Sequence, residues 1–359
     1  MKSSTASKAP ARLIPKAYRA IREEAKPSLE LLEPVSENST IGVLDSFSRT
    51  PTEPSKHGDW VHDVIVNAGF DDDQVVKIEN STGRESNKAL ADLLFADSKE
   101  PFGQRLDAYI ETSACHMLAK TNGSLKQIVA QPSLPFRTLN QSQGNSRVDI
   151  YRLLNGAAFD WSVTPARLTS VGEKMAKECG LEPTGQDFSP LKLRQSFVER
   201  VSEVIGRSER LPALQSEHSH LLATLRDRDV VMVKSAGNSA DDLQDLRQQG
   251  LTVPEDFDDD LTAVGDKLVV GAFFNPGKGN PKDNQMAYFS SQYSAVKVLA
   301  NGFNVPTSPG RVATGTSFAA PQVSSTLEKT RRAHPDWSLS QLEVATISEF
   351  QATDGFNLL

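Results

Sequence analysis

The chain has 359 residues, of which 38% are hydrophobic and 24% charged, and its net charge at neutral pH is -7. This composition is typical of a globular protein large enough to fold around its own core, and the negative charge argues against nucleic acid as a partner. The two cysteines, Cys115 and Cys179, lie far apart without a metal-binding spacing, which favours reduced thiols over a disulfide framework.

The N-terminal region is rich in Ser, Ala and Lys and has no acidic residue before Glu23. It lacks the apolar core of a general secretory signal, and no stretch of the chain approaches the length of a membrane-spanning helix. We therefore expect residues 1–37 to be a leader with one short helix near 15–26. This composition suits a soluble protein that stays in the cytoplasm or is exported by a specialised route, and it suits an organelle transit peptide equally. Nothing in the sequence indicates a membrane partner or an oligomeric state.

The first predicted strand is the aliphatic run 39–44, which ends at Asp45. Apolar residues then recur with helical spacing over 57–69, a segment that His57 opens. Further short hydrophobic strands are predicted at 74–78, 136–140, 229–233, 267–274 and 296–300. Further helices are predicted at 87–95, 104–130, most of 147–228, 315–332 and 338–349. The Asn-Gly pair at 122–123 predicts a break in the helix that contains it.

Short hydrophobic strands that alternate with helices predict an α/β fold, with a mainly parallel central sheet and helices on both of its faces. Reactive groups in such sheets lie at the carboxyl ends of the strands. Asp45, Ser142 and Asn238 all follow predicted strands. We therefore expect these three side chains along one edge of the sheet.

Acidic residues gather in two runs, at 71–73 and 255–260. Such runs are typical of solvated loops. Neither run has the alternating spacing of oxygen ligands that a strong calcium site needs. The sequence therefore predicts no metal and no other cofactor, with structural calcium as the alternative.

The strongest functional signal is the segment GTSFAAP at 315–321, which begins a predicted helix. Small residues around Ser317 let a substrate backbone approach its hydroxyl, and the positive end of the helix dipole favours an oxygen that develops negative charge. A serine at a helix start is otherwise most often an N-cap. The segment resembles the serine motif of the subtilase family, G-T-S-x-[AS]-x-P, at every fixed position. The resemblance implies a subtilisin-like fold and a serine protease with Ser317 as its nucleophile.

Two further motifs of the family follow hydrophobic strands. The resemblance implies a catalytic aspartate at the end of an N-terminal strand, and Asp45 occupies that place, although Phe47 stands where the family usually has glycine. The segment AGN at 236–238 is similar to the family's oxyanion motif. This similarity implies that the Asn238 side chain donates a hydrogen bond to the oxyanion, beside the backbone N–H of Ser317.

The resemblance also implies a His-Gly pair at a helix start, which His57 and Gly58 supply. Asp59 and Trp60 replace the threonine and the second histidine that are usual in the family. Histidine suits the role of base because its pKa lies near neutral pH. His62 is the alternative base, but no glycine follows it, so the resemblance favours His57.

The segment 138–144 resembles the strand whose backbone binds extended substrate in this family. It implies Ser142, Gln143 and Gly144 as substrate-binding residues. The resemblance places the catalytic domain at 38–350, followed by a short tail at 351–359. Within that domain, residues 147–228 exceed what the family core needs, and we interpret them as a helical insertion.

Together, the motifs predict a serine endopeptidase that hydrolyses polypeptide substrates through an acyl-enzyme intermediate. The resemblance implies Asp45, His57 and Ser317 as its catalytic triad. One alternative is a catalytically weak binding protein on the same fold, which the atypical residues after Asp45 and His57 motivate. A second alternative is an esterase or transferase that uses the same triad.

Overall fold

The computed structural model describes residues 40–50, 52–80, 91–95, 98–163, 166–186, 188–275, 284–307 and 310–354. The expected leader, its helix near 15–26 and the end of the expected tail lie outside the described residues. Within them, no helix is both long enough and apolar enough to cross a membrane.

A central sheet runs through the described chain in the strand order β2-β1-β3-β6-β7-β8, with β9 paired to β7. The strands are β1 (Ile41–Asp45), β2 (Val75–Glu79), β3 (Thr138–Gln141), β6 (Val231–Ser235), β7 (Leu268–Phe274), β8 (Gln285–Met286) and β9 (Val296–Asn301). All neighbours are parallel except β7 and β8, which are antiparallel. The predicted α/β fold with a mainly parallel sheet is therefore confirmed.

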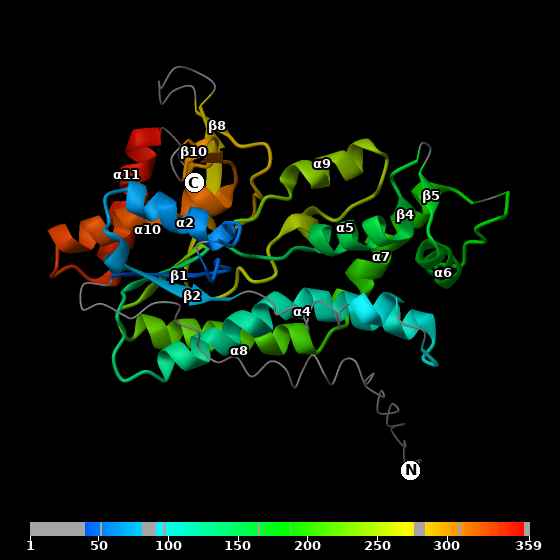
Figure 1. Ribbon diagram of the computed structural model, residues 1–359, viewed down its shortest axis with the longest axis horizontal. Helices are drawn as coiled ribbons and strands as arrows, with labels where there is room; N and C mark the ends of the chain where they lie inside the picture. The colour runs from blue at the N-terminus through cyan, green and yellow to red at the C-terminus, as the bar shows by residue number, and fades with distance from the viewer. Residues whose placement is uncertain are drawn as a thin grey trace, which may run out of the picture.

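Helices cover both faces of this sheet (Figure 1). On one face lie α2 (His57–Asn67), α10 (Thr316–Ala333) and α11 (Leu339–Asp354), and on the other lie α4 (Phe102–Val129) and α8 (Arg210–Arg226). Successive side chains of a strand point to opposite faces. In β1, Ile41 and Val43 therefore pack with α2, whereas Leu44 packs with α4 and α8. Burial on both faces explains why β1 is an unbroken aliphatic run.

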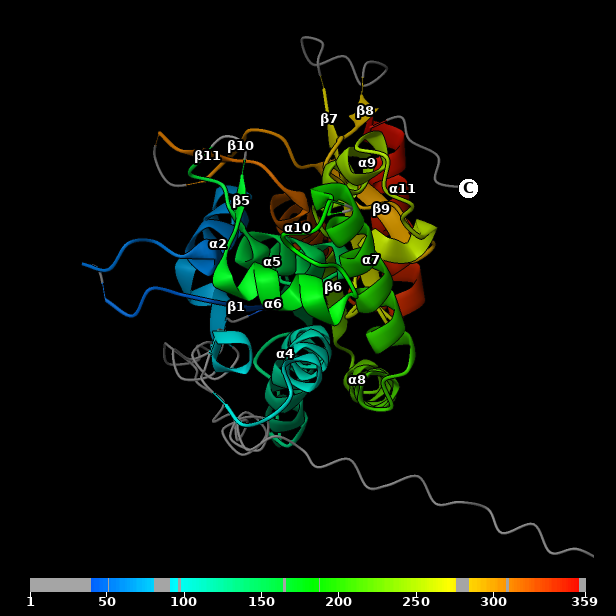
Figure 2. The same ribbon diagram turned by 90° about the vertical axis from the view of Figure 1, so that its right-hand side faces the viewer.

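Helix α4 is continuous across the Asn-Gly pair, so the predicted break at 122–123 is wrong. Asn122 Nδ2 donates to the backbone oxygen of Leu214 at 2.9 Å, and Asn122 Oδ1 lies 2.7 Å from His218 Nδ1. Both partners belong to α8, which packs along α4 (Figure 2). Tertiary hydrogen bonds thus hold Asn122 inside the helix, where its intrinsic propensity alone disfavours it.

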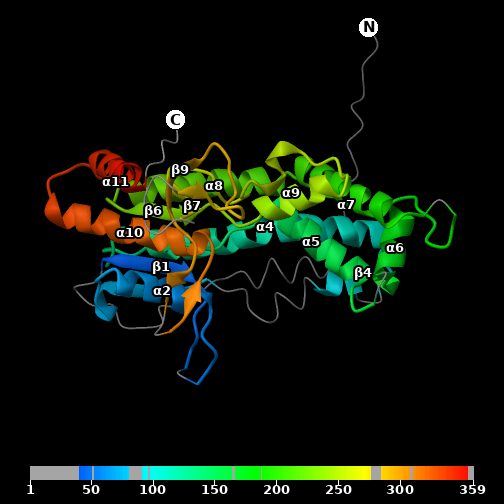
Figure 3. The same ribbon diagram turned by 90° about the horizontal axis from the view of Figure 1, so that it is seen from above.

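The remaining helices form a lobe beyond one end of the sheet (Figure 3). They are α5 (Arg147–Ala158), α6 (Ser170–Glu178), α7 (Pro190–Gly206) and α9 (Ala240–Gln248), with the short strands β4 (Phe159–Asp160) and β5 (Arg167–Leu168). Their core is shared with the first half of α4, where Leu106 and Ile110 are buried. The segment 147–228 therefore divides in two, because α5 to α7 build the lobe whereas α8 covers the sheet and leads into β6. Smaller elements are η1 (Asp72–Gln74), η2 (Glu255–Asp258), β10 (Val305–Pro306) and β11 (Val312–Ala313).

Candidate active site

Three neighbouring parallel strands end at one edge of the sheet, and each brings one of the expected side chains there. Asp45 is the last residue of β1, Ser142 follows β3 directly, and Asn238 lies just beyond β6. β3 pairs with β1 on one side and with β6 on the other, so these ends are adjacent. The first turns of α2 and α10 bring His57 and Ser317 to the same place.

Asp45 is completely buried, and both of its carboxylate oxygens have hydrogen-bond partners. Oδ2 lies 2.8 Å from His57 Nδ1. Oδ1 accepts from the Ser46 backbone N–H at 2.7 Å and from Gln143 Nε2 at 2.9 Å. With Nδ1–H donating to Asp45, His57 keeps the lone pair of Nε2 for another partner.

Burial and the Asp45 carboxylate act on the pKa of His57 in opposite directions. Burial lowers the pKa of this histidine, but the hydrogen bond and the negative charge of Asp45 together raise it more, and the net pKa lies above its ordinary value. The ring also contacts Phe318, with 5.7 Å between the ring centroids, which limits its orientations. His57 is thus held in place by a carboxylate on one edge and an aromatic ring beside it.

Ser317 is buried in the first turn of α10 and is joined to the end of β3 by reciprocal hydrogen bonds. Its Oγ donates to the Ser142 carbonyl oxygen at 3.1 Å, and Ser142 Oγ donates to the Ser317 carbonyl oxygen at 3.1 Å. Gly315, two residues before Ser317, has a φ of 151°, a conformation that side-chain-bearing residues rarely adopt. The glycine of the motif therefore permits the turn that presents Ser317.

The Asn238 side chain is oriented by the residue before Ser317. Its Oδ1 accepts from the Thr316 backbone N–H at 2.8 Å and from Thr316 Oγ1 at 3.0 Å. Because Thr316 holds Oδ1, Nδ2 lies on the other side of the amide group. It would lie 3.2 Å from a Cβ added at Gly315. Asn238 is exposed, so its amide N–H groups are accessible to a ligand at Ser317.

The atypical residues after Asp45 and His57 have structural roles. Phe47 is fully buried, and its ring lies 2.8 Å from the place of a Cβ added at Gly58, so the two positions pack as a pair. Asp59 Oδ2 accepts from the backbone N–H groups of Lys56 at 2.7 Å and Ser48 at 3.1 Å, and so caps α2. Trp60 packs against the core beneath α2. None of these contacts interrupts the hydrogen bond from His57 to Asp45.

His62, the alternative base, is placed elsewhere. It is buried on α2, and its Nε2 lies 3.0 Å from Asp72 Oδ1, outside good hydrogen-bond geometry. His62 does not line the cavity that holds Ser317, whereas His57 does. The structure therefore brings His57, and not His62, together with the expected nucleophile.

A cavity of about 400 Å³ opens beside Ser317. Among its lining residues are His57, Ser142, Gln143, Gly144, Asn145, Ser146, Asp149, Arg152, Ser235, Ala236, Gly237, Asn238, Asp258, Asp260 and Ser317. The segments after β3 and β6 form two of its walls. The predicted base, nucleophile, oxyanion residue and substrate segment thus share one cavity, with Asp45 directly behind His57.

The prediction that the acidic run 255–260 is a solvated loop is wrong for part of its length. Asp258 and Asp260 are only 5% and 7% exposed, and both line the cavity. Asp260 tolerates burial because Lys234 Nζ lies 2.7 Å from its Oδ2. Two sequence signals pointed to this arrangement: a lysine inside the buried strand β6, and Phe257 within the acidic run.

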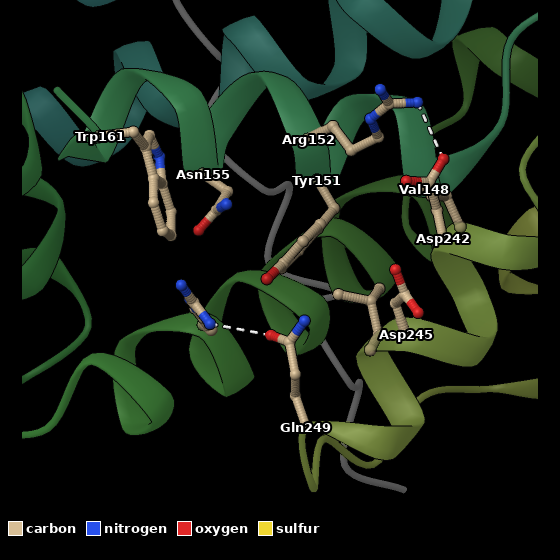
Figure 4. Close-up of a pocket in the computed structure, with 10 residues that line it drawn as sticks. Val148, Tyr151, Arg152, Asn155, Trp161, Asp242, Asp245 and Gln249 are labelled. Carbon is tan, nitrogen blue, oxygen red and sulfur yellow. Dashed lines mark hydrogen bonds and ion pairs between the residues drawn. The ribbon is translucent and has the colours of Figure 1, made fainter. Parts of the chain in front are cut away.

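A second cavity, of about 370 Å³, lies between α5, α7 and α9 (Figure 4). Arg152 lines both cavities, and its Nη1 contacts Asp242 Oδ2 at 2.8 Å. Arg194 lies over the Trp161 ring, 5.0 Å from the ring centroid, and donates to Gln249 at 2.8 Å. The helical lobe therefore contributes directly to the surroundings of the site.

Within the described residues, no group of three or more His, Cys, Asp or Glu side chains is arranged to hold a metal ion. The acidic run Asp71–Asp73 is exposed. Two of the acids that line the cavity beside Ser317 have protein partners, Lys234 for Asp260 and Ser146 for Asp149.

Comparison with known proteins matches residues 184–357 to the model of the subtilase family. No curated protein matches the chain. Similar solved structures include a lanthipeptide protease, at 13% identity and a TM-score of 0.37, over 91% of this chain and 81% of that chain. They also include MycP1 from Mycobacterium smegmatis, at 14% identity and a TM-score of 0.39, over 93% of this chain and 78% of that chain.

The contact between Gly144 and the buried ion pair yields a stability prediction. A Cβ added at Gly144 would lie 2.0 Å from Asp260 Oδ2 and 2.8 Å from Lys234 Nζ. We expect Gly144→Ala to lower the free energy of unfolding by about 1–3 kcal/mol, the usual cost of overpacking. Gly156→Ala is the control, because a Cβ there meets nothing within 4 Å and alanine suits helix α5. Urea unfolding measures both variants, and equal effects would contradict the proposed packing.

Proposed function

We propose that this chain, whose residues 184–357 match the model of the subtilase family, is a serine endopeptidase with Asp45, His57 and Ser317 as its triad. The observation that carries the proposal is the 2.8 Å contact between His57 Nδ1 and the buried carboxylate of Asp45. His57 also lines the same cavity as Ser317. The three side chains come from β1, α2 and α10, which lie far apart in sequence. Their convergence is what nucleophilic catalysis by serine requires.

The reaction begins when the Ser317 hydroxyl turns from the Ser142 carbonyl toward His57. His57 Nε2 then takes the hydroxyl proton while Oγ attacks the scissile carbonyl carbon. Asp45 stabilises the resulting imidazolium and holds the ring. Collapse of the tetrahedral intermediate breaks the C–N bond, and the leaving amine takes the proton from His57. A water molecule, deprotonated by His57, hydrolyses the acyl-enzyme in the reverse order of steps.

The negative oxygen of the tetrahedral intermediate needs donors already in place. Asn238 Nδ2 is one such donor, because Thr316 holds the other end of the amide. The backbone N–H of Ser317, in the first turn of α10, is the second, and the positive end of the helix dipole adds to its effect. Since side chains and backbone amides carry every step, we propose a mechanism without a metal or other cofactor.

The polypeptide substrate would lie along the segment Ser142–Gly144, which continues β3 beyond the sheet. Gly144 is exposed, and the segment forms one wall of the cavity beside Ser317. An extended peptide can pair with such a backbone as an added strand, with alternate side chains entering pockets. This position would bring a scissile carbonyl between Ser317 and Asn238.

We further propose that the lobe restricts which substrates enter. Helix α5 begins immediately after the substrate segment and lines both cavities through Arg152. The contact of Arg152 with Asp242 joins α5 to α9 at this point (Figure 4). A peptide that extends beyond the cavity beside Ser317 would therefore meet the lobe rather than open solvent.

A catalytically weak binding protein is not favoured as an alternative. That alternative was motivated by the unusual residues Phe47, Asp59 and Trp60. These residues pack against α2 or cap it, and the hydrogen bond between His57 and Asp45 is present beside them. An esterase or transferase would use the same triad. Peptide cleavage separates that alternative from the proposed endopeptidase.

The first prediction tests the triad directly. We expect a fluorophosphonate probe to label Ser317, and Ser317→Ala to abolish both labelling and peptide cleavage. His57→Ala should lower kcat by a comparable factor because the triad acts as a unit. His62→Ala is the matched control on the same helix and should retain labelling. A protein that loses activity with His62→Ala but keeps it with His57→Ala would refute the assignment of the base.

The second prediction concerns the oxyanion. Asn238→Ala should lower kcat by about 10²–10³, the usual effect of removing one oxyanion donor, with little change in KM. The change in kcat arises because the bond to the substrate oxygen strengthens only in the transition state. Steady-state kinetics on one peptide give both constants. A large rise in KM at unchanged kcat would show that Asn238 binds ground-state substrate instead.

The third prediction concerns pH. His57 accepts a proton only when neutral, and its pKa is raised above the ordinary value of 6.5. As pH falls, kcat/KM should therefore decline through a midpoint above 6.5, the ordinary histidine value. NMR titration of His57 in the Ser317→Ala variant checks the same pKa without turnover. A midpoint below the ordinary histidine value would show that burial lowers the pKa of His57 more than Asp45 raises it.

A further inference from the structure

The cavity beside Ser317 is placed to receive one substrate side chain. Ser142–Gly144 and Ser235–Gly237 form two of its walls, and Asn238 and Ser317 also line it. If the substrate carbonyl oxygen points to Asn238, the side chain of the same residue falls between these walls. The groups that line the cavity then decide which side chain is accepted at the position just before the scissile bond.

Three carboxylates line this cavity, and they differ in their partners. Asp260 forms a buried ion pair with Lys234 Nζ at 2.7 Å and also accepts from the Thr262 backbone N–H at 2.8 Å. Asp149 accepts from the Ser146 backbone N–H and hydroxyl, both at 2.8 Å, in the cap of α5. Burial raises the pKa of Asp258, and its own backbone, the Ser291 side chain and the charge of Arg247 lower it in part.

The charges in the described part of the cavity do not balance. Lys234 offsets Asp260, and Arg152, which also lines the cavity, is paired with Asp242 at 2.8 Å. The ion pairs of the described chain include none for Asp258 or Asp149. Two carboxylates therefore line the cavity without an ion pair among the described residues, although the charge of Arg247 lowers the pKa of Asp258 in part.

Asp258 is the better candidate for binding a substrate. The oxygens of Asp149 are already used in capping α5, whereas Asp258 has one side-chain donor, Ser291. Asp258 is 5% exposed, and burial raises its pKa because an ionised carboxylate is poorly solvated there. A cation that enters the cavity would supply the ion-pair partner that Asp258 lacks among the described residues.

We infer that Asp258 makes this protease selective for a lysine or arginine residue immediately before the scissile bond. The inference rests on the proposed endopeptidase function. An ammonium or guanidinium group at the end of such a side chain would form a charge-assisted hydrogen bond with the Asp258 carboxylate. An apolar side chain of the same length would leave that carboxylate buried without compensation.

The test compares two peptides that differ only in having lysine or norleucine before the cleaved bond. Norleucine has the carbon chain of lysine without the ammonium group, so the ratio of the two kcat/KM values isolates the charge. We expect the wild-type ratio to favour lysine, and Asp258→Asn to lower this ratio about tenfold to a hundredfold, the range for a hydrogen bond to a charged group. Because a ratio does not depend on the folded fraction, partial misfolding of the variant does not mimic the result.

Asp256→Asn is the matched control. Asp256 belongs to the same turn, η2, and its side chain is 58% exposed and paired with Arg147 at 3.1 Å. It does not line the cavity. Its substitution removes the same charge from the same turn and should leave the lysine-to-norleucine ratio unchanged. An equal fall of the lysine-to-norleucine ratio in both variants would show that the ratio depends on the negative charge of the whole turn. That result would overturn the role of Asp258.

Binding to the Ser317→Ala variant separates this inference from the proposed function. Calorimetry with the same two peptides should show tighter binding of the lysine peptide, and Asp258→Asn should remove the difference. If Ser317 is labelled and peptides are cleaved without any preference for lysine or arginine, the inference fails while the proposed function stands. If neither labelling nor cleavage occurs but the lysine peptide still binds preferentially through Asp258, the proposed function fails and the cationic site stands.

Discussion

The buried carboxylate of Asp45 is the constraint on which the site depends. An ionised group without solvent is stable only when its oxygens receive hydrogen bonds. Asp45 receives them from His57 at the start of α2, from Gln143 beyond β3 and from the backbone of Ser46. The hydrogen bonds to this one charge therefore fix β1, the start of α2 and the segment after β3 relative to one another. Of these, β1 and α2 carry two members of the proposed triad, Asp45 and His57.

A second set of hydrogen bonds fixes the nucleophile against the same strand. Ser142 and Ser317 exchange hydrogen bonds between their hydroxyl and carbonyl groups, and Asn140 Nδ2 donates to the Ser142 hydroxyl at 3.0 Å. The start of α10 is thereby attached to the end of β3. Because Gln143 follows on that same segment and reaches Asp45, the base and the nucleophile are positioned from one continuous stretch of backbone.

The lobe extends this arrangement away from the sheet. Helix α4 is long enough to cover the sheet with its second half and to supply the lobe core with its first half, at Leu106 and Ile110. Helices α5 and α9 leave the site from the ends of the two cavity walls, and the pair of Arg152 and Asp242 joins them. The surroundings of Ser317 are thus polar and charged. Burying charged groups is costly unless they are paired, and pairs such as Lys234 with Asp260 meet this condition.

The sequence by itself determined the features that depend on neighbours along the chain. Aliphatic runs specify strands buried on both faces. The GTSFAAP segment marks the turn before α10, because a glycine at position 315 tolerates the backbone conformation of that turn. These signals were enough for the α/β fold and for the order of its strands along the chain. They also named the residues that the structure brings into one cavity.

Only the tertiary structure decided which distant groups meet. His57 and His62 lie on the same helix, and their different partners, Asp45 and Asp72, come from other segments. Asn122 stays helical because α8 satisfies its amide, a contact that no local pattern reveals. The same is true of Asp258, which belongs to a run that is acidic in sequence yet lies buried beside Ser317. The physical reason is that desolvation and ion pairing depend on the packing of the whole chain, whereas propensity and hydrophobic periodicity are properties of short segments.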